Sequence, residues 1–235
     1  MELSVVIPLF NEEESLLLLQ EKLHGVCEKI TGSYEIIYVD DGSTDSSPDV
    51  LRRMQKNYPA VRSISFQENQ GQSAGLLAGF KASQGEWIIT LDADLQNPPE
   101  EILKLWEFKD RFEFITGIRE KRRDSFLRKI SSRIAKLFRW ITLGDTTQDV
   151  GCSLRLFRRE IVGSLPYFKN FHRFFTFLAR EAGFSIQEVP LQHSERKFGN
   201  SKYTTWKRAK EGVFDLIGVF WLKRRLINFK IKSKT

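Results

Sequence analysis

The sequence contains few cysteines and does not show the features of a secretory signal. The 235 residues include 2 cysteines, Cys27 and Cys152, which are too few for the disulfide framework of a small secreted domain. The chain runs from Met1 directly into an apolar stretch, without the basic region and small-residue cleavage site of a secretory signal. We therefore expect a protein of the reducing cytoplasm.

Histidine clusters and long hydrophobic runs are missing as well. The 3 histidines lie far apart and do not show the spacing of a transition-metal site. The longest apolar stretch near the C-terminus, residues 212–222, contains Asp215 and is shorter than the ~20 residues of a membrane-spanning helix. The sequence therefore predicts no transmembrane segment.

The net charge of +7 is spread unevenly. Residues 1–100 contain 7 Lys/Arg and 16 Asp/Glu, whereas residues 119–139 contain 9 and 2, and residues 196–235 contain 12 and 2. An acidic first half suits the binding of a cation, and basic segments suit anionic partners. The aromatic-interleaved modules of nucleic-acid-binding proteins are missing. We therefore expect no nucleic acid and favour an anionic membrane surface with a phosphorylated lipid.

Short β-branched runs alternate with helical patterns in the first hundred residues. The pattern predicts strands at 3–8, 34–39, 61–66 and 87–91, and helices at 12–24, 45–56 and 72–83. Such alternation indicates βαβ units and a parallel sheet in an α/β domain. Ligands bind such sheets at the carboxyl ends of the strands, which directs attention to the loops 8–13, 40–44 and 92–99.

The second half of the chain is less regular. We expect an amphipathic helix at 124–141, strands at 153–157 and 185–191, a helix at 172–182 and a last helix at 202–226. No repeat or low-complexity linker interrupts the chain. A single domain over residues 1–225 with a basic tail at 226–235 is the prediction.

Two carboxylates follow the strand at 87–91. Asp92 and Asp94, two residues apart, can converge on one hard divalent cation, and the carbonyl of Gln96 offers a further oxygen ligand. A cation there would stabilise a departing nucleoside diphosphate. A solvated acidic turn is the alternative that the motif alone leaves open.

The loops after the first two strands suit a nucleotide. Asp40 and Asp41 can accept hydrogen bonds from a base or a ribose, although the same segment also suits the cap of the next helix. After Pro8, Phe10 can lie against a base, while Glu12 can orient a ribose or simply favour the start of the helix.

Three stretches in this order resemble the nucleotide-binding half of family 2 glycosyltransferases. They are Val-Val-Ile-Pro-Leu-Phe-Asn-Glu, Val-Asp-Asp-Gly-Ser-Thr-Asp and Leu-Asp-Ala-Asp-Leu-Gln. The resemblance implies a GT-A fold, with a mostly parallel, Rossmann-like nucleotide-binding sheet flanked by helices.

The second half is similar to the polyprenyl-phosphate branch of that family, which includes dolichol-phosphate mannose synthases and undecaprenyl-phosphate glycosyltransferases. The similarity lies at residues 90–102, a turn at 117–119, and residues 124–129, 151–155 and 195–203. It implies a nucleotide-sugar and metal half at 1–118, an acceptor half at 119–203 and a C-terminal amphipathic helix at 204–225. It assigns metal and diphosphate to Asp92, Asp94 and Gln96, and the acceptor phosphate to the following residues: Arg119, Arg128, Ser132 and Arg196.

The chemistry of phosphate binding supports this assignment. Arginine offers paired donors to phosphate oxygens, and Arg128 and Ser132 lie four residues apart on one helix face. A basic solvated surface is the alternative for that helix. Asp149 either orients the acceptor or acts as its base. Since a lipid phosphate is already an anion near neutral pH, we favour orientation. Asp94, Asp149 and Arg119 are the predicted catalytic residues.

The resemblance predicts an inverting transfer of a sugar from GDP-mannose or a UDP-hexose to undecaprenyl or dolichyl phosphate, with Mg²⁺ or Mn²⁺ as cofactor. Two alternatives stay open: a saccharide acceptor, or a nucleotide-sugar-binding module without activity.

The C-terminal segment suits a membrane surface. Aromatic and aliphatic residues of 206–221 lie beside the cations that follow residue 222, as in a helix that lies in the interface. A core-packed helix with a solvated tail is the alternative. We expect a peripheral protein on the cytosolic face of the membrane, with room for an integral membrane partner.

Overall fold

The computed structural model describes residues 1–120, 126–194 and 205–226. Two compact units are present. The first combines Met1–Arg122 with Gln148–Asn200, and the second combines Arg123–Thr147 with Ser201–Thr235. Each unit is assembled from segments that are distant in sequence. The single domain over residues 1–225, with divisions at 1–118, 119–203 and 204–225, stays a prediction.

A seven-stranded sheet in the order β3-β2-β1-β4-β6-β5-β7 forms the centre of the first unit. The pairs of β1 with β2 and β4, of β2 with β3, and of β5 with β7 are parallel, whereas β6 is antiparallel to both of its neighbours. The predicted mostly parallel sheet is therefore confirmed. The strands are β1 (Leu3–Leu9), β2 (Tyr34–Asp40), β3 (Val61–Ser65), β4 (Trp87–Thr90), β5 (Phe114–Arg119), β6 (Arg155–Arg158) and β7 (Ile186–Leu191).

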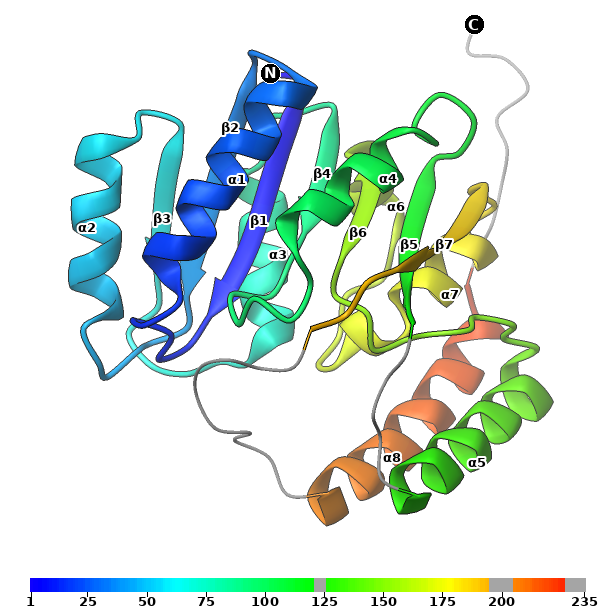
Figure 1. Ribbon diagram of the computed structural model, residues 1–235. Coiled ribbons are helices and arrows are strands. Elements are labelled where there is room, and N and C mark those ends of the chain that lie inside the picture. The colour runs from blue at the N-terminus through cyan, green and yellow to red at the C-terminus, as the bar shows by residue number, and fades with distance from the viewer. Residues whose placement is uncertain (121–125, 195–204, 227–235) are drawn as a thin grey trace, which may run out of the picture. The chain divides into compact units, whose positions relative to one another are not determined.

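Helices cover both faces of this sheet (Figure 1). One face carries α1 (Leu16–Ile30), α2 (Ser47–Asn57), the 3₁₀ turn η1 (Pro99–Glu101) and α4 (Ile102–Trp106). The other carries α3 (Gln72–Ala82), η2 (Phe171–Arg173) and α7 (Phe175–Glu181), and the short α6 (Glu160–Ser164) follows β6. All seven residues of β1 are buried, as expected for a central parallel strand covered on both sides.

Each face has its own core. Aliphatic side chains of β1, β2 and β4 pack with α1, α2 and α4 on one face. On the other face an aromatic cluster packs in stacked and edge-on contacts with ring centroids 4.9–5.8 Å apart; its members are Phe80, Phe114, Phe157, Phe171 and Phe175. These two layers hold the sheet rigid beneath the loops at its carboxyl edge.

The structure corrects one prediction about the second half. Residues 117–119, expected as a turn, are the end of strand β5. Gly117 is needed inside this strand, because a Cβ there would lie 2.4 Å from Cδ1 of Leu191 and 2.7 Å from Sγ of Cys152. A glycine that permits a close approach within a strand is easily mistaken for a turn signal.

The second unit contains α5 (Phe126–Leu143) and α8 (Thr205–Lys223), which lie side by side (Figure 1). Their C-terminal ends meet where Nζ of Lys223 donates to the carbonyl of Leu143 at 2.7 Å. Both helices expose large apolar side chains, spaced for one face of each helix: Ile134, Leu137, Phe138, Trp140 and Ile141 on α5, and Val213, Phe214, Ile217 and Trp221 on α8. Within the described residues, no helix has both the length and the apolar character to cross a membrane.

Candidate active site

The loops at the carboxyl ends of β1, β2 and β4 form one edge of the sheet, as the sequence predicted. The β4 loop contains an unusual backbone conformation, because Leu95 has a φ of 59°. Non-glycine residues seldom adopt this left-handed region and often mark functional turns when they do. The turn is held by the N–H of Gln96, which donates to Oδ1 of Asp94 at 3.1 Å, and by the N–H of Ser194, which donates to the carbonyl of Gln96 at 2.8 Å.

Asp92 is held in place by two side chains to which the sequence interpretation gave no role. Nε2 of Gln72, in the first turn of α3, donates to Oδ1 of Asp92 at 2.9 Å, and the hydroxyl of Ser153 hydrogen-bonds the same carboxyl group. Burial and then the charge of Asp94 raise the pKa of Asp92 to about 6, against the opposing effects of Ser153 and of two arginines.

The carboxylate pair fits a hard divalent cation. Asp92 and Asp94 supply oxygen ligands of the kind that Mg²⁺ and Mn²⁺ prefer, and Asp94 is 5% exposed. Within the described residues, no group of three or more His, Cys, Asp or Glu side chains could hold a metal ion by itself. The carbonyl of Gln96 stays a predicted third ligand.

Ser153 connects this loop to its surroundings. Its hydroxyl accepts a hydrogen bond from Nδ2 of Asn97 at 3.0 Å, and its carbonyl accepts one from the hydroxyl of Thr90 at 2.6 Å. Oδ1 of Asn97 lies 3.4 Å from Nδ1 of His193. These contacts make the strand end, the acidic loop and the segment after β7 one polar network.

Asp40 and Asp41 are buried, and their carboxylates shape loops. Asp40 accepts the N–H of Ser43 at 2.9 Å. Both oxygens of Asp41 are used within the protein: Oδ1 accepts the N–H of Gln70 at 2.7 Å, and Oδ2 accepts the N–H of Gly71 at 2.9 Å. Asp41 thereby positions the loop that leads into α3 and to the glutamine that contacts Asp92.

The loops after β1 and β2 interlock. The N–H of Asn11 donates to the hydroxyl of Ser43 at 2.9 Å, and the N–H of Thr44 donates to Oδ1 of Asn11 at 2.7 Å. The N–H of Glu12 donates to the hydroxyl of Ser47 at 3.0 Å. The structure therefore brings together the loops that carry five of the predicted nucleotide residues, Pro8, Phe10, Glu12, Asp40 and Asp41; the sixth, Asp92, lies in the β4 loop.

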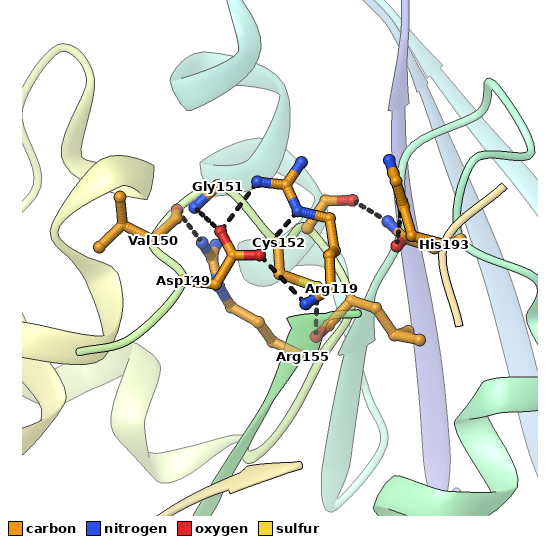
Figure 2. Close-up of polar contacts among 10 residues, drawn as sticks. Arg119, Asp149, Val150, Gly151, Cys152, Arg155 and His193 are labelled. Atoms are coloured by element: carbon orange, nitrogen blue, oxygen red, sulfur yellow. Dashed lines mark hydrogen bonds and ion pairs between the residues drawn. The ribbon is translucent and has the colours of Figure 1, made fainter. Parts of the chain in front are cut away.

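Arg119 and Asp149 form a two-point ion pair (Figure 2). Nε of Arg119 lies 2.7 Å from Oδ2 of Asp149, and Nη2 lies 2.8 Å from Oδ1. The same carboxylate accepts the N–H of Arg119 at 3.2 Å and the N–H of Gly151 at 3.0 Å. A side chain at Gly151 would collide with this pair, because its Cβ would lie 2.4 Å from Nη2 of Arg119.

These four hydrogen bonds decide the chemistry of Asp149. Burial alone would raise the pKa of Asp149, but the hydrogen bonds and charge of Arg119 outweigh burial and bring the pKa below its ordinary value. Burial alone would lower the pKa of Arg119. The hydrogen bond and the charge of Asp149 outweigh burial and raise this pKa above its ordinary value. A carboxylate so stabilised is a poor proton acceptor. The geometry therefore fits a residue that orients Arg119.

For the other three residues predicted to bind an acceptor phosphate, the position relative to this site stays a prediction. Ser132 is exposed on α5 in the second unit. The side chain of Arg128 and the whole of Arg196 lie outside the described residues. Of the four residues predicted to bind an acceptor phosphate, Arg119 lies at the end of β5, and its charge acts to lower the pKa of Asp92.

The sequence interpretation missed Gln72, Ser153 and Arg155 as parts of this site. Arg155 lies at the start of β6, is 4% exposed, and acts electrostatically on Asp92 and Asp149. Ser153 and Arg155 belong to residues 151–155, which contributed to the family resemblance. That resemblance could have identified both as site residues. Gln72 gave no signal, since a polar residue in the first turn of a helix is common.

Comparisons with known proteins bear on these observations. The sequence profile described as "Glycosyl transferase family 2" matches residues 4–165. Undecaprenyl-phosphate 4-deoxy-4-formamido-L-arabinose transferases of Salmonella choleraesuis and Salmonella gallinarum are 39% identical to the chain over 218 residues. The match covers 92% of this chain and 66% of each relative, so the chain spans slightly less than two thirds of their length.

Solved structures share the fold. Mannosyl-3-phosphoglycerate synthase from Rubrobacter xylanophilus matches with a TM-score of 0.74 at 14% identity, over 100% of this chain and 79% of that one. Glucosyl-3-phosphoglycerate synthase from Mycobacterium tuberculosis, in complex with Mn²⁺, UDP and phosphoglyceric acid, matches with a TM-score of 0.70 at 16% identity, over 97% and 80%. The likeness confirms the predicted GT-A architecture.

Proposed function

Because the chain belongs to glycosyltransferase family 2, we propose that it transfers a sugar from a nucleotide diphospho-sugar to the phosphate of a polyprenyl lipid, with inversion at the anomeric carbon. The carboxylate pair Asp92 and Asp94 at the carboxyl end of β4 carries this proposal. Its support is the 39% identity to transferases named for undecaprenyl phosphate.

On the donor side, the two carboxylates would hold Mg²⁺ or Mn²⁺, the ions present in the glucosyl-3-phosphoglycerate synthase complexes. Such an ion neutralises the diphosphate and stabilises it as a leaving group. Gln72 and Ser153 keep Asp92 in one orientation. The interlocked loops after β1 and β2 would bind the nucleoside. GDP-mannose and UDP-sugars are both candidate donors.

On the acceptor side, Arg119 would draw the lipid phosphate toward the anomeric carbon. A phosphate oxygen forms the new bond to that carbon, and the bond from the carbon to the diphosphate oxygen breaks. The acceptor is already an anion and needs no base. Asp149 holds the guanidinium through two hydrogen bonds. Arg128, Ser132 and Arg196 are proposed as further contacts of this phosphate.

The state of Asp149 also weighs against a saccharide acceptor. A sugar hydroxyl needs a base, and a carboxylate of lowered pKa that already accepts four hydrogen bonds is poorly suited to that role. The other alternative, a binding module without activity, is tested by donor turnover.

A polyprenyl phosphate lies in a membrane, so an enzyme that uses it must bind at the membrane surface. The exposed apolar faces of α5 and α8 support peripheral attachment, because residues such as Trp140, Phe214 and Trp221 have no core to fill. Lys223, Arg224 and other cations near these faces suit an anionic surface. We place this attachment on the cytosolic face, either alone or with an integral membrane partner.

The decisive experiment measures transfer of radiolabel into lipid extracts. Undecaprenyl and dolichyl phosphates are offered with GDP-mannose, UDP-hexoses and a UDP-linked 4-deoxy-4-formamido-L-arabinose. Lipid-extractable label that depends on Asp94, but not on the exposed Asp110 in a matched Asp110→Asn control, is the expected result. Label that appears in saccharides instead would contradict the proposed acceptor, and absence of turnover with every donor would support a binding module.

A further inference from the structure

Arg155 has an unusual place for a buried arginine. It pairs in register with Thr90 of β4 on one side and with Thr116 of β5 on the other. Asp92 follows Thr90 by two positions, and Arg119 follows Thr116 by three. Arg155 therefore lies between the strand that leads to the acidic loop and the strand that ends in the acceptor-side arginine.

The side chain of Arg155 is buried but makes few hydrogen bonds. It is 4% exposed. Nη2 donates to the carbonyl of Val150 at 3.2 Å, and Cζ lies 5.8 Å from the ring centroid of Phe175. Nε is buried without a hydrogen-bond partner, and no ion pair joins Arg155 to the residues that the structure describes. Burial of a guanidinium with so little compensation costs free energy, so packing alone does not account for this residue.

The carbonyl that Arg155 binds belongs to a turn with two functions. Asp149, at the start of the turn, holds Arg119 through two hydrogen bonds. Ser153, at its end, hydrogen-bonds the carboxyl group of Asp92. Figure 2 shows the guanidinium of Arg155 reaching Val150 beside the Arg119–Asp149 pair. The hydrogen bond from Arg155 therefore holds the middle of this stretch, while the hydroxyl of Thr90 holds its end at Ser153.

Charge gives a second reason for an arginine here. Burial lowers the pKa of Arg155, and the charge of Arg119 acts in the same direction. The Cys152 thiol and the carboxylates of Asp92 and Asp149 act in the opposite direction. The guanidinium thus lies within electrostatic reach of both carboxylates. A neutral side chain of similar size would keep the packing against Phe175 and lose this countercharge.

We propose that Arg155 is a positioning residue of the transfer reaction. It fixes the 149–153 turn so that Asp92 and Arg119 keep the spacing that the two phosphate-bearing substrates require, and its buried charge compensates the acidic loop. This inference rests on the proposed function.

Arg155→Met and Arg155→Lys test the proposal, with Arg158→Met as the matched control. Arg158 lies on the same strand, pairs with Glu86 and lies 4.6 Å above the ring of Trp87. Two quantities are measured for each variant, corrected for the folded fraction from thermal unfolding: kcat for lipid-linked product, and the affinity for UDP or GDP with Mn²⁺. We expect Arg155→Met to lower both by about tenfold or more, corresponding to roughly 1.4 kcal/mol or more. Arg155→Lys should recover part of each, and Arg158→Met should leave both unchanged.

Two outcomes would overturn the inference. Wild-type kcat and nucleotide affinity per folded molecule in Arg155→Met would show that the arginine only supports the fold. Equal losses in Arg155→Met and Arg158→Met would show that any cation removed from β6 has the same effect. If the wild type binds nucleotide with Mn²⁺ but transfers no sugar to either lipid, the proposed function fails, and the nucleotide affinities alone decide the role of Arg155.

Discussion

Replacement of Asp149 by Asn separates an orienting role from a base role. The amide would place its nitrogen against one N–H of Arg119, a donor facing a donor, and would leave the guanidinium without its countercharge. The pair is mostly buried, with side-chain exposures of 14% for Arg119 and 10% for Asp149. Removal of one partner from a buried pair costs about 3–5 kcal/mol, and the residual exposure favours the lower end. At about 2–4 °C per kcal/mol for a chain of this size, we expect Tm to fall by roughly 6–12 °C.

The pH–rate profile then distinguishes the two roles. The pKa of Asp149 lies below its ordinary value, so the group is ionised throughout pH 5–8. Its contribution to stability is full in that range and is lost only as the pH falls through the lowered pKa. We expect Asp149→Asn to lower kcat by about ten- to a hundredfold, the cost of a misplaced charge-assisted contact, with the shape of the profile unchanged from pH 5 to 8.

A profile that lost its acid limb in Asp149→Asn would assign Asp149 the role of general base and refute this reasoning. An unchanged Tm would show that the ion pair contributes little to folding. Arg119→Lys serves as the companion variant, because it keeps the charge but cannot form both hydrogen bonds. It should show a smaller loss of Tm than Asp149→Asn.

Four further outcomes are expected. Chelation of divalent cations should abolish transfer and Mn²⁺ should restore it, while Asp94→Ala should be folded by circular dichroism but inactive; full turnover in either case would contradict the metal assignment. Arg128→Ala should lower kcat/KM for the lipid phosphate by ten- to a hundredfold, about 1.5–3 kcal/mol, and leave nucleotide affinity unchanged; the reverse result would place it on the donor side. Phe214→Asp should weaken vesicle binding about tenfold without loss of Tm, since the ring is 81% exposed and its transfer to the interface contributes about 1.5–3 kcal/mol; equal binding would remove α8 from the membrane contact. Burial raises the pKa of Cys27 to about 12 and that of Cys152 to about 11, so neither thiol should react with a disulfide reagent at pH 8 until denaturant is added; rapid native labelling would show local opening.

The sequence was informative where local patterns and the fold agree. The four strands of the first hundred residues begin where predicted, because each is a short run rich in β-branched or aromatic residues. The placement of Asp92 and Asp94 at a strand end followed from the same pattern. The first helix was predicted at residues 12–24 and lies at Leu16–Ile30. Its second half continues because Val26 and Cys27 pack into the core beyond Gly25.

Contacts between distant segments could not be predicted in this way. Arg119 and Asp149 each suggested phosphate chemistry, yet their pairing depends on the positions of β5 and of a turn thirty residues later. The nucleotide contact of Asp41 stays a prediction, and its hydrogen bonds from the backbone of Gln70 and Gly71 could not be anticipated from the sequence. The partner of a carboxylate depends on the distances between segments in the folded protein. A single sequence does not give these distances.

The Arg119–Asp149 pair also joins the two ends of a long segment of the chain, residues 120–148. The residues between its two members include all of α5, which belongs to the other compact unit, while the neighbouring strands β5 and β6 keep their register on either side. Loop-closure entropy rises slowly with length, by about 0.6 kcal/mol for each doubling. The segment can therefore be lengthened, shortened or exchanged at little cost to the sheet, provided that both ends still meet at this ion pair. In evolutionary terms, the sheet and the segment that includes α5 can diversify separately as long as the Arg119–Asp149 pair is kept.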